Sequence, residues 1–434
     1  MSVLTEKQFT EALPSSLDLF ELSPYQTSIL LHYYVDVRPL SAITDTSPVE
    51  FLIPGAGSDY MDLAKTRLVV NLKVKHTDNT PLAAKEKVGP VNLLLASLWS
   101  AVSVAFQGQQ VNINNAAYPY KAMFKTLLQY GADAKTSQLE TQLFYTDNGD
   151  DQSDWNSVDP YSGGNDGLIN RGLFIAKSKR LSLSGPLMED VFEFKNKLVN
   201  GVDVGIKLFR SSVPFILMSD ETTKQYVVEL EDVYLKVCKL KVNNALIVAQ
   251  SKQFESANAL YPYMRSEMKV ASVAASQMSY TWDNMYLNKC PSRLVVGMVR
   301  ADAYNGSLTK NPFCFIGEDV EKVTLYLDGT PVPNRGLSPD DVEAYVNMYL
   351  WNNIWREDRG LGIKRNEFKI GNALFVFNLE SASGDDDYLN LLKSGTLRLE
   401  VQFNKALTTT MNIVVMSQMP SLIEIDQTRN VFVK

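Results

Sequence analysis

The sequence has 434 residues, of which 45% are hydrophobic and 21% are charged. This composition is ordinary for a globular protein, and it excludes a disordered tail, a collagen-like rod and a disulfide-stapled miniprotein. The 42 basic and 49 acidic residues give a net charge of −7. That balance argues against a surface built to neutralise many phosphates, so no specific nucleic-acid binding is predicted. The length is enough for two or three domains.

Alternation of apolar and polar residues predicts a mainly β protein, because every second side chain of a strand lies on the same face. In chain order, strands are predicted at Val49–Ile53, Arg67–Lys75, Val102–Phe106, Leu181–Ser184, Val202–Arg210, Val227–Val237, Arg293–Val299, Val323–Leu327, Leu374–Leu379, Leu397–Phe403 and Met411–Met416. Two substantial helices are predicted, one in each half. The first spans Tyr118–Tyr130. The second spans Ser338–Asn353, with Ser338 as the expected N-cap and a proline directly after it.

Short matches between the two halves predict an internal duplication. In the same order, Arg67–Val70 matches Arg293–Val296, Val102–Val111 matches Val323–Val332, Val202–Leu208 matches Leu397–Phe403, and Met218–Ser219 matches Met416–Ser417. The second match is a predicted hairpin in both halves, turning at Gln107-Gly108 or Asp328-Gly329, and the helix of its half follows it. The boundary is expected near Asn243–Glu267, where strand alternation lapses. Two sandwiches of the jelly-roll type fit this pattern, with two dissimilar β-domains as the alternative.

Two acidic segments interrupt the strand pattern. Asp147–Gly167 lacks regular apolar spacing and is rich in Asp, Asn, Ser and Gly. We interpret it as a solvated loop, with calcium binding as the alternative, although it lacks the final glutamate of an EF-hand. Asp385–Asp387 is interpreted as a turn, with a cation or subunit contact as the alternative.

Cysteine and histidine are too scarce to support much metal or acid–base chemistry. The cysteines Cys238, Cys290 and Cys314 lie far apart without a CxxC pair, so neither a disulfide framework nor a structural zinc site is predicted. Of the two histidines, His32 and His76, neither lies near a nucleophile elbow, and His76 is expected in an exposed turn after a strand. The longest apolar runs fall far short of the ~20 residues that span a bilayer, and no signal-peptide core begins the sequence.

No segment carries a recognisable active site. Gly55–Tyr60 begins like a dinucleotide fingerprint, but Tyr60 stands where the third glycine belongs, and a strand follows it. Tyr349, Trp351 and Trp355 are of the type that stacks on sugars, but at helical spacing such residues more often anchor a core or an interface. Paired carboxylates need only meet in space, so a glycosidase stays an alternative. No catalytic, cofactor-binding or metal-ligating residue is predicted.

Seven stretches carry a family resemblance and keep their order along the chain. They are Pro48–Leu63, Pro90–Val104, Tyr118–Gln138, Leu198–Arg210, Asn311–Phe315, Val323–Pro333 and Leu422–Asn430. Together they resemble the major capsid proteins, hexon-like and double jelly-roll, of the Polinton/Maverick and adintovirus lineage. The resemblance covers most of residues 45–434, and it is weakest in the first 45 residues and in the acidic loop at 147–167.

The resemblance implies an all-β double jelly roll, in which two eight-stranded sandwiches lie side by side with one helix-bearing insertion per half. The domains it implies are an N-terminal arm at 1–45, a first jelly roll at 46–245 and a second jelly roll at 246–434. Capsid subunits of this family have no enzymatic activity and no cofactor, so neither is expected here.

The resemblance also implies pseudo-hexameric homotrimers that tile an icosahedral shell, with penton or other minor capsid proteins as partners. The protein is then expected in the virion, after synthesis in the host cytoplasm. The helix Ser338–Asn353 is a candidate trimer anchor, and the loop Asp147–Gly167 is expected in an outward crown. The arm, with its apolar residues Phe20, Leu22, Tyr25 and Ile29, is expected to bind a neighbour or face the interior. The alternatives are a minor, penton-like capsid protein and a two-domain carbohydrate-binding protein or glycosidase.

Overall fold

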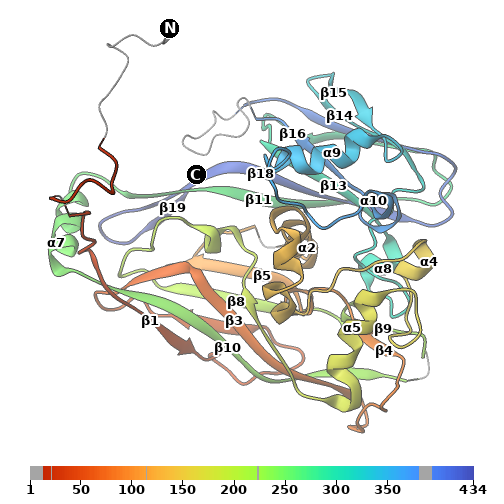
Figure 1. Cartoon of the computed structure of the whole chain (residues 1–434), viewed down its shortest axis with the longest axis horizontal. Helices are drawn as coiled ribbons and strands as arrows, with labels where there is room; N and C mark the ends of the chain where they lie inside the picture. Colours follow the sequence, from red (N-terminus) through yellow and green to blue (C-terminus); the bar gives the residue numbers. More distant parts are fainter. Residues whose placement is uncertain (1–12, 21, 114, 222–223, 381–392) are drawn as a thin grey trace.

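The first half of the chain forms a β-sandwich of two antiparallel sheets (Figure 1). The structure is a computed structural model that describes residues 13–20, 22–113, 115–221, 224–380 and 393–434. In spatial order, one sheet contains β1 (Ile29–Val37), β10 (Tyr226–Val242), β3 (Tyr60–His76) and β7 (Leu181–Pro186). The other contains β2 (Val49–Ile53), β8 (Val204–Arg210), β5 (Trp99–Phe106) and β6 (Gln109–Gln110). Inward residues such as Val70, Phe106 and Ile206 are fully buried between them.

The second half repeats this arrangement. Its first sheet contains β11 (Ala259–Val273), β18 (Met411–Ile425), β13 (Arg293–Arg300) and β16 (Leu374–Asn378), with β19 (Val431–Val433) paired to β18. Its second sheet contains β12 (Ser279–Tyr286), β17 (Leu397–Phe403), β14 (Val320–Leu327) and β15 (Thr330–Leu337). A small extra sheet pairs β4 (Val88–Pro90) with β9 (Leu217–Ser219).

Strand order shows that the two halves have the same topology. If the eight sandwich strands of each half are numbered along the chain, both halves have one sheet in the order 1-8-3-6 and one in the order 2-7-4-5. This is the order of a jelly roll, in which two Greek keys cross between the sheets. Three of the four sequence matches fall on equivalent strands: β3 with β13, β5 with β14, and β8 with β17. The fourth is wrong, because Met218 lies in β9, outside both sandwich sheets, whereas Met416 lies in β18. A match of only two residues is too short to identify equivalent strands.

The two predicted hairpin turns are confirmed by their backbone conformation. Gln107 and Gly108 have φ of 50° and 78°, and Asp328 and Gly329 have φ of 48° and 83°. Two successive residues with positive φ match the right-handed twist of the flanking strands, which is why hairpins favour this turn. Both turns therefore lie between the fourth and fifth sandwich strands of their half.

Each half carries a helical insertion between its fifth and sixth sandwich strands, as predicted. In the first half it contains α2 (Tyr118–Gln129), α3 (Ala132–Lys135), α4 (Gln152–Trp155) and α5 (Asp166–Ile175), with the 3-10 turns η2 (Gln138–Gln142) and η3 (Ala176–Ser178). In the second half it contains α9 (Val342–Trp351) and α10 (Arg365–Gly371). The remaining helical elements are α1 (Leu94–Ser97), η4 (Asp190–Glu193), α6 (Val213–Ile216), α7 (Asn244–Gln253) and α8 (Ala301–Asn305). None of the described helices is long and apolar enough to cross a membrane.

Two sequence boundaries need correction. The helix α9 begins at Val342 and not at Ser338, because Ser338 closes a turn in which its carbonyl accepts from the backbone N–H of Asp341 at 3.2 Å. The proposed boundary segment at 243–267 is not free of strands, since β11 begins at Ala259 after α7. The alternation of apolar and polar residues lapses in this segment only because of the helix α7.

All of the predicted strands are present, but the pattern misses the sandwich strands β1, β11 and β12 and the short strands β4, β9 and β19. The edge strand β1 lies inside the range expected for the arm, and it pairs with β10 from Ile29 to Val37. Its first four residues are all exposed, so apolar side chains occur on both faces and the alternation that marks a half-buried strand is lost. An edge strand of this kind has a sequence that periodicity cannot recognise.

The helix α2 belongs to the first half but lies between the two sandwiches (Figure 1). Eleven of its residues are buried. The ring of Tyr120 stacks on Tyr304 of the second half at 5.1 Å and meets Phe313 edge-on at 5.7 Å. Phe124 contacts Phe315 at 5.2 Å. The two halves therefore share one continuous core, which α2 fills.

Candidate assembly surfaces

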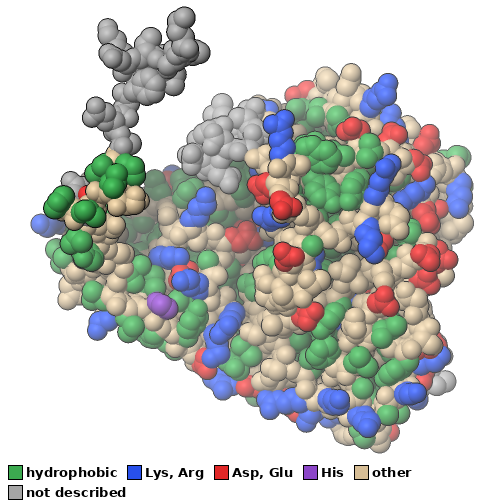
Figure 2. All heavy atoms as spheres, in the orientation of Figure 1, with side chains coloured by type: hydrophobic (Ala, Val, Ile, Leu, Met, Phe, Trp, Pro, Cys, Tyr) green, Lys and Arg blue, Asp and Glu red, His purple; other side chains and the backbone are tan. Residues whose placement is uncertain are grey.

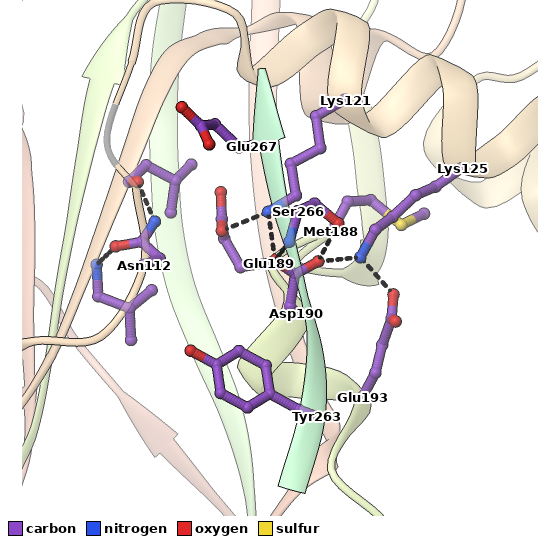
Figure 3. A network of polar contacts seen from close by, with 12 residues as sticks. Asn112, Lys121, Lys125, Met188, Glu189, Asp190, Glu193, Tyr263, Ser266 and Glu267 are labelled. Atoms are coloured by element: carbon purple, nitrogen blue, oxygen red, sulfur yellow. Dashed lines mark hydrogen bonds and ion pairs between the residues drawn. The ribbon is translucent and has the colours of Figure 1, made fainter. Parts of the chain in front are cut away.

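A buried cluster of charges joins the two sandwiches beside α2, and we call it the junction cluster (Figure 3). Its members are Lys121 and Lys125 of α2, Glu189, Asp190 and Glu193 at η4, and Ser266 of β11. The Nζ atom of Lys121 lies 2.8 Å from Oε2 of Glu189 and 3.0 Å from Oδ2 of Asp190. The Nζ atom of Lys125 lies 2.7 Å from Oδ1 of Asp190 and 2.7 Å from Oε1 of Glu193.

Asp190 is the member that connects the halves. Its Oδ2 accepts the backbone N–H of Ser266 at 2.8 Å, and its Oδ1 accepts the Ser266 hydroxyl at 2.8 Å. Burial alone would raise the pKa of Asp190, but the ammonium groups of Lys121 and Lys125 outweigh it and hold that pKa well below its usual range. Asp190 is therefore an anion that satisfies three groups from the first half and the second half together.

The lysines of the junction cluster stay charged for the same reason. Burial alone would lower the pKa of Lys125, but the carboxylates of Asp190 and Glu193 outweigh burial and raise it. Burial also raises the pKa of Glu189, and Lys121 opposes that shift. A buried ion pair contributes specificity of arrangement more than net stability, because desolvation cancels much of the attraction. The cluster therefore fixes the orientation of one sandwich against the other.

The sequence analysis did not find the junction cluster. One local signal was available: Lys121 and Lys125 stand one turn apart within the otherwise apolar helix α2. Lysines at that spacing share one helix face, and α2 has no exposed face to receive them. The acidic partners lie more than 60 residues later in the chain, so no local pattern identifies them.

A third buried lysine, Lys135, links the halves, and its described partners are backbone carbonyl oxygens. Lys135 of α3 donates to the carbonyl oxygens of Leu127 at 2.7 Å and of Leu361, in the second half, at 2.6 Å. Burial lowers the pKa of Lys135 to about 7. A neutral amine has two N–H groups, and the two carbonyls match them.

The acidic excursion at 147–167 is not a solvated loop, so that interpretation is wrong: the segment contains α4 and the start of α5, and Asp147, Trp155 and Asn165 are buried. Asp147 is buried, and its Oδ1 pairs with Nη2 of Arg171 at 2.7 Å and accepts from Asn165 at 3.0 Å. Its Oδ2 accepts from Asn311 of the second half at 3.2 Å. Within the described residues, no group of three or more His, Cys, Asp or Glu is arranged to hold a metal ion.

The residues Asp385–Asp387 lie outside the described residues. Among the other sequence candidates, His76 is not in an exposed turn: it ends β3, its ring stacks on Tyr226 at 5.4 Å, and it lies 3.1 Å from Oε1 of Glu86. Gly55 serves close packing, because a Cβ at that position would lie 2.3 Å from the carbonyl oxygen of Val202. Packing within the protein therefore explains both His76 and Gly55.

The aromatic helix α9 is half core and half surface. Ala344 and Met348 are fully buried, whereas Val342 and Leu350 are exposed. The hydroxyl groups of Tyr345 and Tyr349 lie 2.8 Å apart, and Tyr345 also donates to the Ile363 carbonyl at 2.8 Å. Trp355, just after the helix, packs edge-on against Tyr349 and is 54% exposed. The side chain of Trp351 lies outside the described part of the structure.

The N-terminal arm, which we define as the described residues from 13 to 28, presents the most exposed apolar side chains of the structure. Figure 2 shows apolar side chains gathered over the arm and α7 at one end of the molecule. The exposed residues are Leu13, Leu17, Leu19, Phe20, Leu22 and Tyr25, of which Phe20 is 96% exposed. A large apolar patch on a soluble protein marks a site of interaction. The arm and the exposed side chains of Val342, Leu350 and Trp355 are therefore candidate interaction surfaces.

Comparison with known proteins identifies the class of fold. No family model matches the sequence. An uncharacterised protein of Caenorhabditis elegans is 22% identical over 403 residues, which cover 88% of this chain and 91% of that protein. A chain in the structure of the Sputnik virophage has a TM-score of 0.67 at 12% identity, covering 98% of this chain and 93% of its own.

Two major capsid proteins share the fold as well. The mavirus major capsid protein has a TM-score of 0.55 at 12% identity, over 99% of this chain and 96% of its own. The Faustovirus major capsid protein has a TM-score of 0.60 at 9% identity, over 96% and 93%. The chain therefore has the double jelly-roll fold of these major capsid proteins along its whole length. The particular lineage, Polinton/Maverick and adintovirus, stays a prediction.

Proposed function

We propose that this protein is the major capsid protein of a virus or virus-like element, with a structural and not an enzymatic role. The observation that carries the proposal is the pair of eight-stranded rolls with the same strand order, fused in one chain and held together by the junction cluster. The match to the mavirus and Faustovirus major capsid proteins over nearly the full length of each chain supports it.

Three copies of such a chain form a pseudo-hexameric homotrimer in our proposal. Two rolls of one topology per chain give six blocks of similar outline around a three-fold axis, and such a unit tiles a hexagonal layer of an icosahedral shell. The first roll of one copy then meets the second roll of the next, which is a closed heterologous contact. The exposed apolar residues at α9, Val342, Leu350 and Trp355, are candidate anchors of that contact, since aromatic residues dominate interface energies.

The domains of the proposal are an N-terminal segment at 1–45, which includes the arm, the first jelly roll at 46–245 and the second at 246–434. Sheet membership supports the division, because the sandwich strands of the first half end at Val242 and those of the second begin at Ala259. The strand β1 lies within residues 1–45 but is also part of the first sandwich. The insertion at 147–167 belongs to the outward crown in this proposal. Penton or other minor capsid proteins are its partners in the virion, after synthesis in the host cytoplasm.

The oligomeric state of the purified full-length chain tests this proposal. Light scattering at micromolar concentration should give three times the 48.6 kDa of one chain, and electron microscopy should show a flat hexagonal particle with three-fold symmetry. The double variant Leu350→Ser/Trp355→Ser should dissociate the trimer without unfolding the chain, because both side chains are about half exposed in the single chain. The matched control Leu173→Ser, an equally exposed leucine in α5, should leave the trimer intact. A monomeric wild-type protein would overturn the proposal.

A further inference from the structure

A groove lies between α7 and the first sandwich, and we call it the α7 groove. Its volume is about 650 Å³, within the range of ~300–1,000 Å³ that is typical of pockets for drug-sized ligands. Leu246 of α7 and Phe254, which directly follows that helix, form part of one wall, and Leu240 of β10 and Tyr261 of β11 form part of the other. The groove is thus lined mainly by apolar side chains, at the point where one roll connects to the next.

The helix α7 is incompletely packed against the body of the protein. None of its ten residues, all of which the structure describes, is buried. Leu246, Ile247 and Phe254 are only partly buried against the core, and Val248 is 58% exposed. A helix on a globular protein normally buries an apolar stripe. The α7 groove is therefore the space that a further apolar segment would fill.

The arm has the apolar side chains that such a segment needs. Its six exposed apolar residues have exposed fractions from 62% to 96%, and the arm lies at the same end of the molecule as α7 (Figures 1 and 2). Each copy of the protein supplies one arm and one groove, so the stoichiometry is matched in any assembly of identical chains.

The direction of the arm favours the groove of a second copy over its own. Ser28 and Ile29 line the rim of the groove, so the arm begins there and runs outward. No turn occurs between Leu22 and Thr27, and Pro24 keeps the preceding residue extended. The arm would have to reverse within these residues to enter its own groove. In contrast, the stretch from Leu13 to Ser28 reaches roughly 50 Å when extended, at ~3.3 Å per residue.

We propose that the arm of one copy docks in the α7 groove of a neighbouring copy, with Phe20 and Leu22 among the residues that fill it. This inference rests on the proposed function, because it requires copies of the chain to assemble. The arm then acts as a reciprocal strap: each copy gives one arm and receives one.

Engineered cysteines test the proposal in the full-length chain. One chain carries Phe20→Cys in the arm, and a second chain, with a different tag, carries Ala257→Cys at the exposed edge of the groove. The three native cysteines are all buried, so they do not compete. The two chains are co-expressed, assembled and oxidised. A disulfide-linked pair containing both tags is the expected product. The control replaces Ala257→Cys by Thr330→Cys, in a distant exposed hairpin, and should give no such pair.

Each other outcome overturns the inference in a distinguishable way. In a third variant that carries both Phe20→Cys and Ala257→Cys in one chain, a disulfide that closes only within that chain would show that the arm occupies its own groove. Trimers or larger particles that form no cross-link at all would overturn the docking and leave the proposed function standing. If the wild-type chain formed no oligomer in light scattering, the proposed function would fail, and the inference would fail with it.

Discussion

Replacing Asp190 by asparagine tests whether the junction cluster holds the two rolls together. The change keeps the shape of the side chain but removes the carboxylate that pairs with Lys121 and Lys125. Lys125 is fully buried and would keep only Glu193, whose side chain is 49% exposed. Breaking a buried ion pair on one side costs ~3–5 kcal/mol. Since each lysine retains one carboxylate, we expect a loss of about 3 kcal/mol in the free energy of unfolding at pH 7, measured by urea denaturation.

The pH dependence of that loss provides a second measurement. The pKa of Asp190 in the folded protein lies below the value of ~3.9 in an unfolded chain. Its carboxylate therefore contributes stability at neutral pH, and this contribution is lost as the pH falls below about 4. The difference between wild type and Asp190→Asn should shrink accordingly. The control Glu424→Gln removes a surface pair with Lys434 and should change nothing measurable. A loss below about 1 kcal/mol for Asp190→Asn, or a loss unchanged at pH 3, would refute the reasoning.

Three further changes have defined outcomes. Because burial lowers the pKa of Lys135 to about 7, the unfolded chain binds a proton between pH 7 and 10 that the folded chain does not. The free energy of unfolding should therefore rise with pH across that window by up to ~1.4 kcal/mol per pH unit. In urea titrations at several pH values, Lys135→Met should abolish this rise. A rise that is the same in the variant as in the wild type would contradict the prediction. A Cβ at position 108 would meet no atom within 4 Å, but Gly108 has φ of 78°. Gly108→Ala should therefore lower the free energy of unfolding by ~1–2 kcal/mol in calorimetry, whereas Gly205→Ala in β8 should lower it much less. Asp147→Asn leaves the buried Arg171 without a charge partner and should cost ~3 kcal/mol, with faster proteolysis of residues 147–175; equal proteolysis rates would count against it.

The sandwich architecture could be predicted because its strands have one buried and one exposed face. Strands such as β17, with buried and partly exposed residues in strict alternation, carry the signal in every residue. The repeated Arg-Leu-Val-Val sequence identified equivalent strands β3 and β13 because both are the third sandwich strand of their half. The edge strand β1 lacks this signal, because its first four residues are all exposed, so it was missed.

The contacts between the rolls could not be predicted, because they depend on residues that meet only after folding. Asp147 stands in a segment with the composition of a solvated loop, yet it is buried against Asn311 of the other half. Lys121 and Asp190 lie 69 residues apart in the sequence, so the spacing of Lys121 and Lys125 in α2 can indicate a buried charge but not its acidic partner. Composition describes the average environment of a segment, while burial of a single charge depends on its partners.

The position of α2 has a consequence for how independently the two rolls can vary in sequence. Although they share a topology, the seam is asymmetric: α2 of the first half fills it, and the backbone N–H of Ser266 in the second half donates to a carboxylate of the first. The second roll expressed alone would expose Phe313 and Phe315, which now lie against Tyr120. The two rolls are thus complementary at the seam, and we expect them to fold as one unit, because each covers apolar surface of the other there.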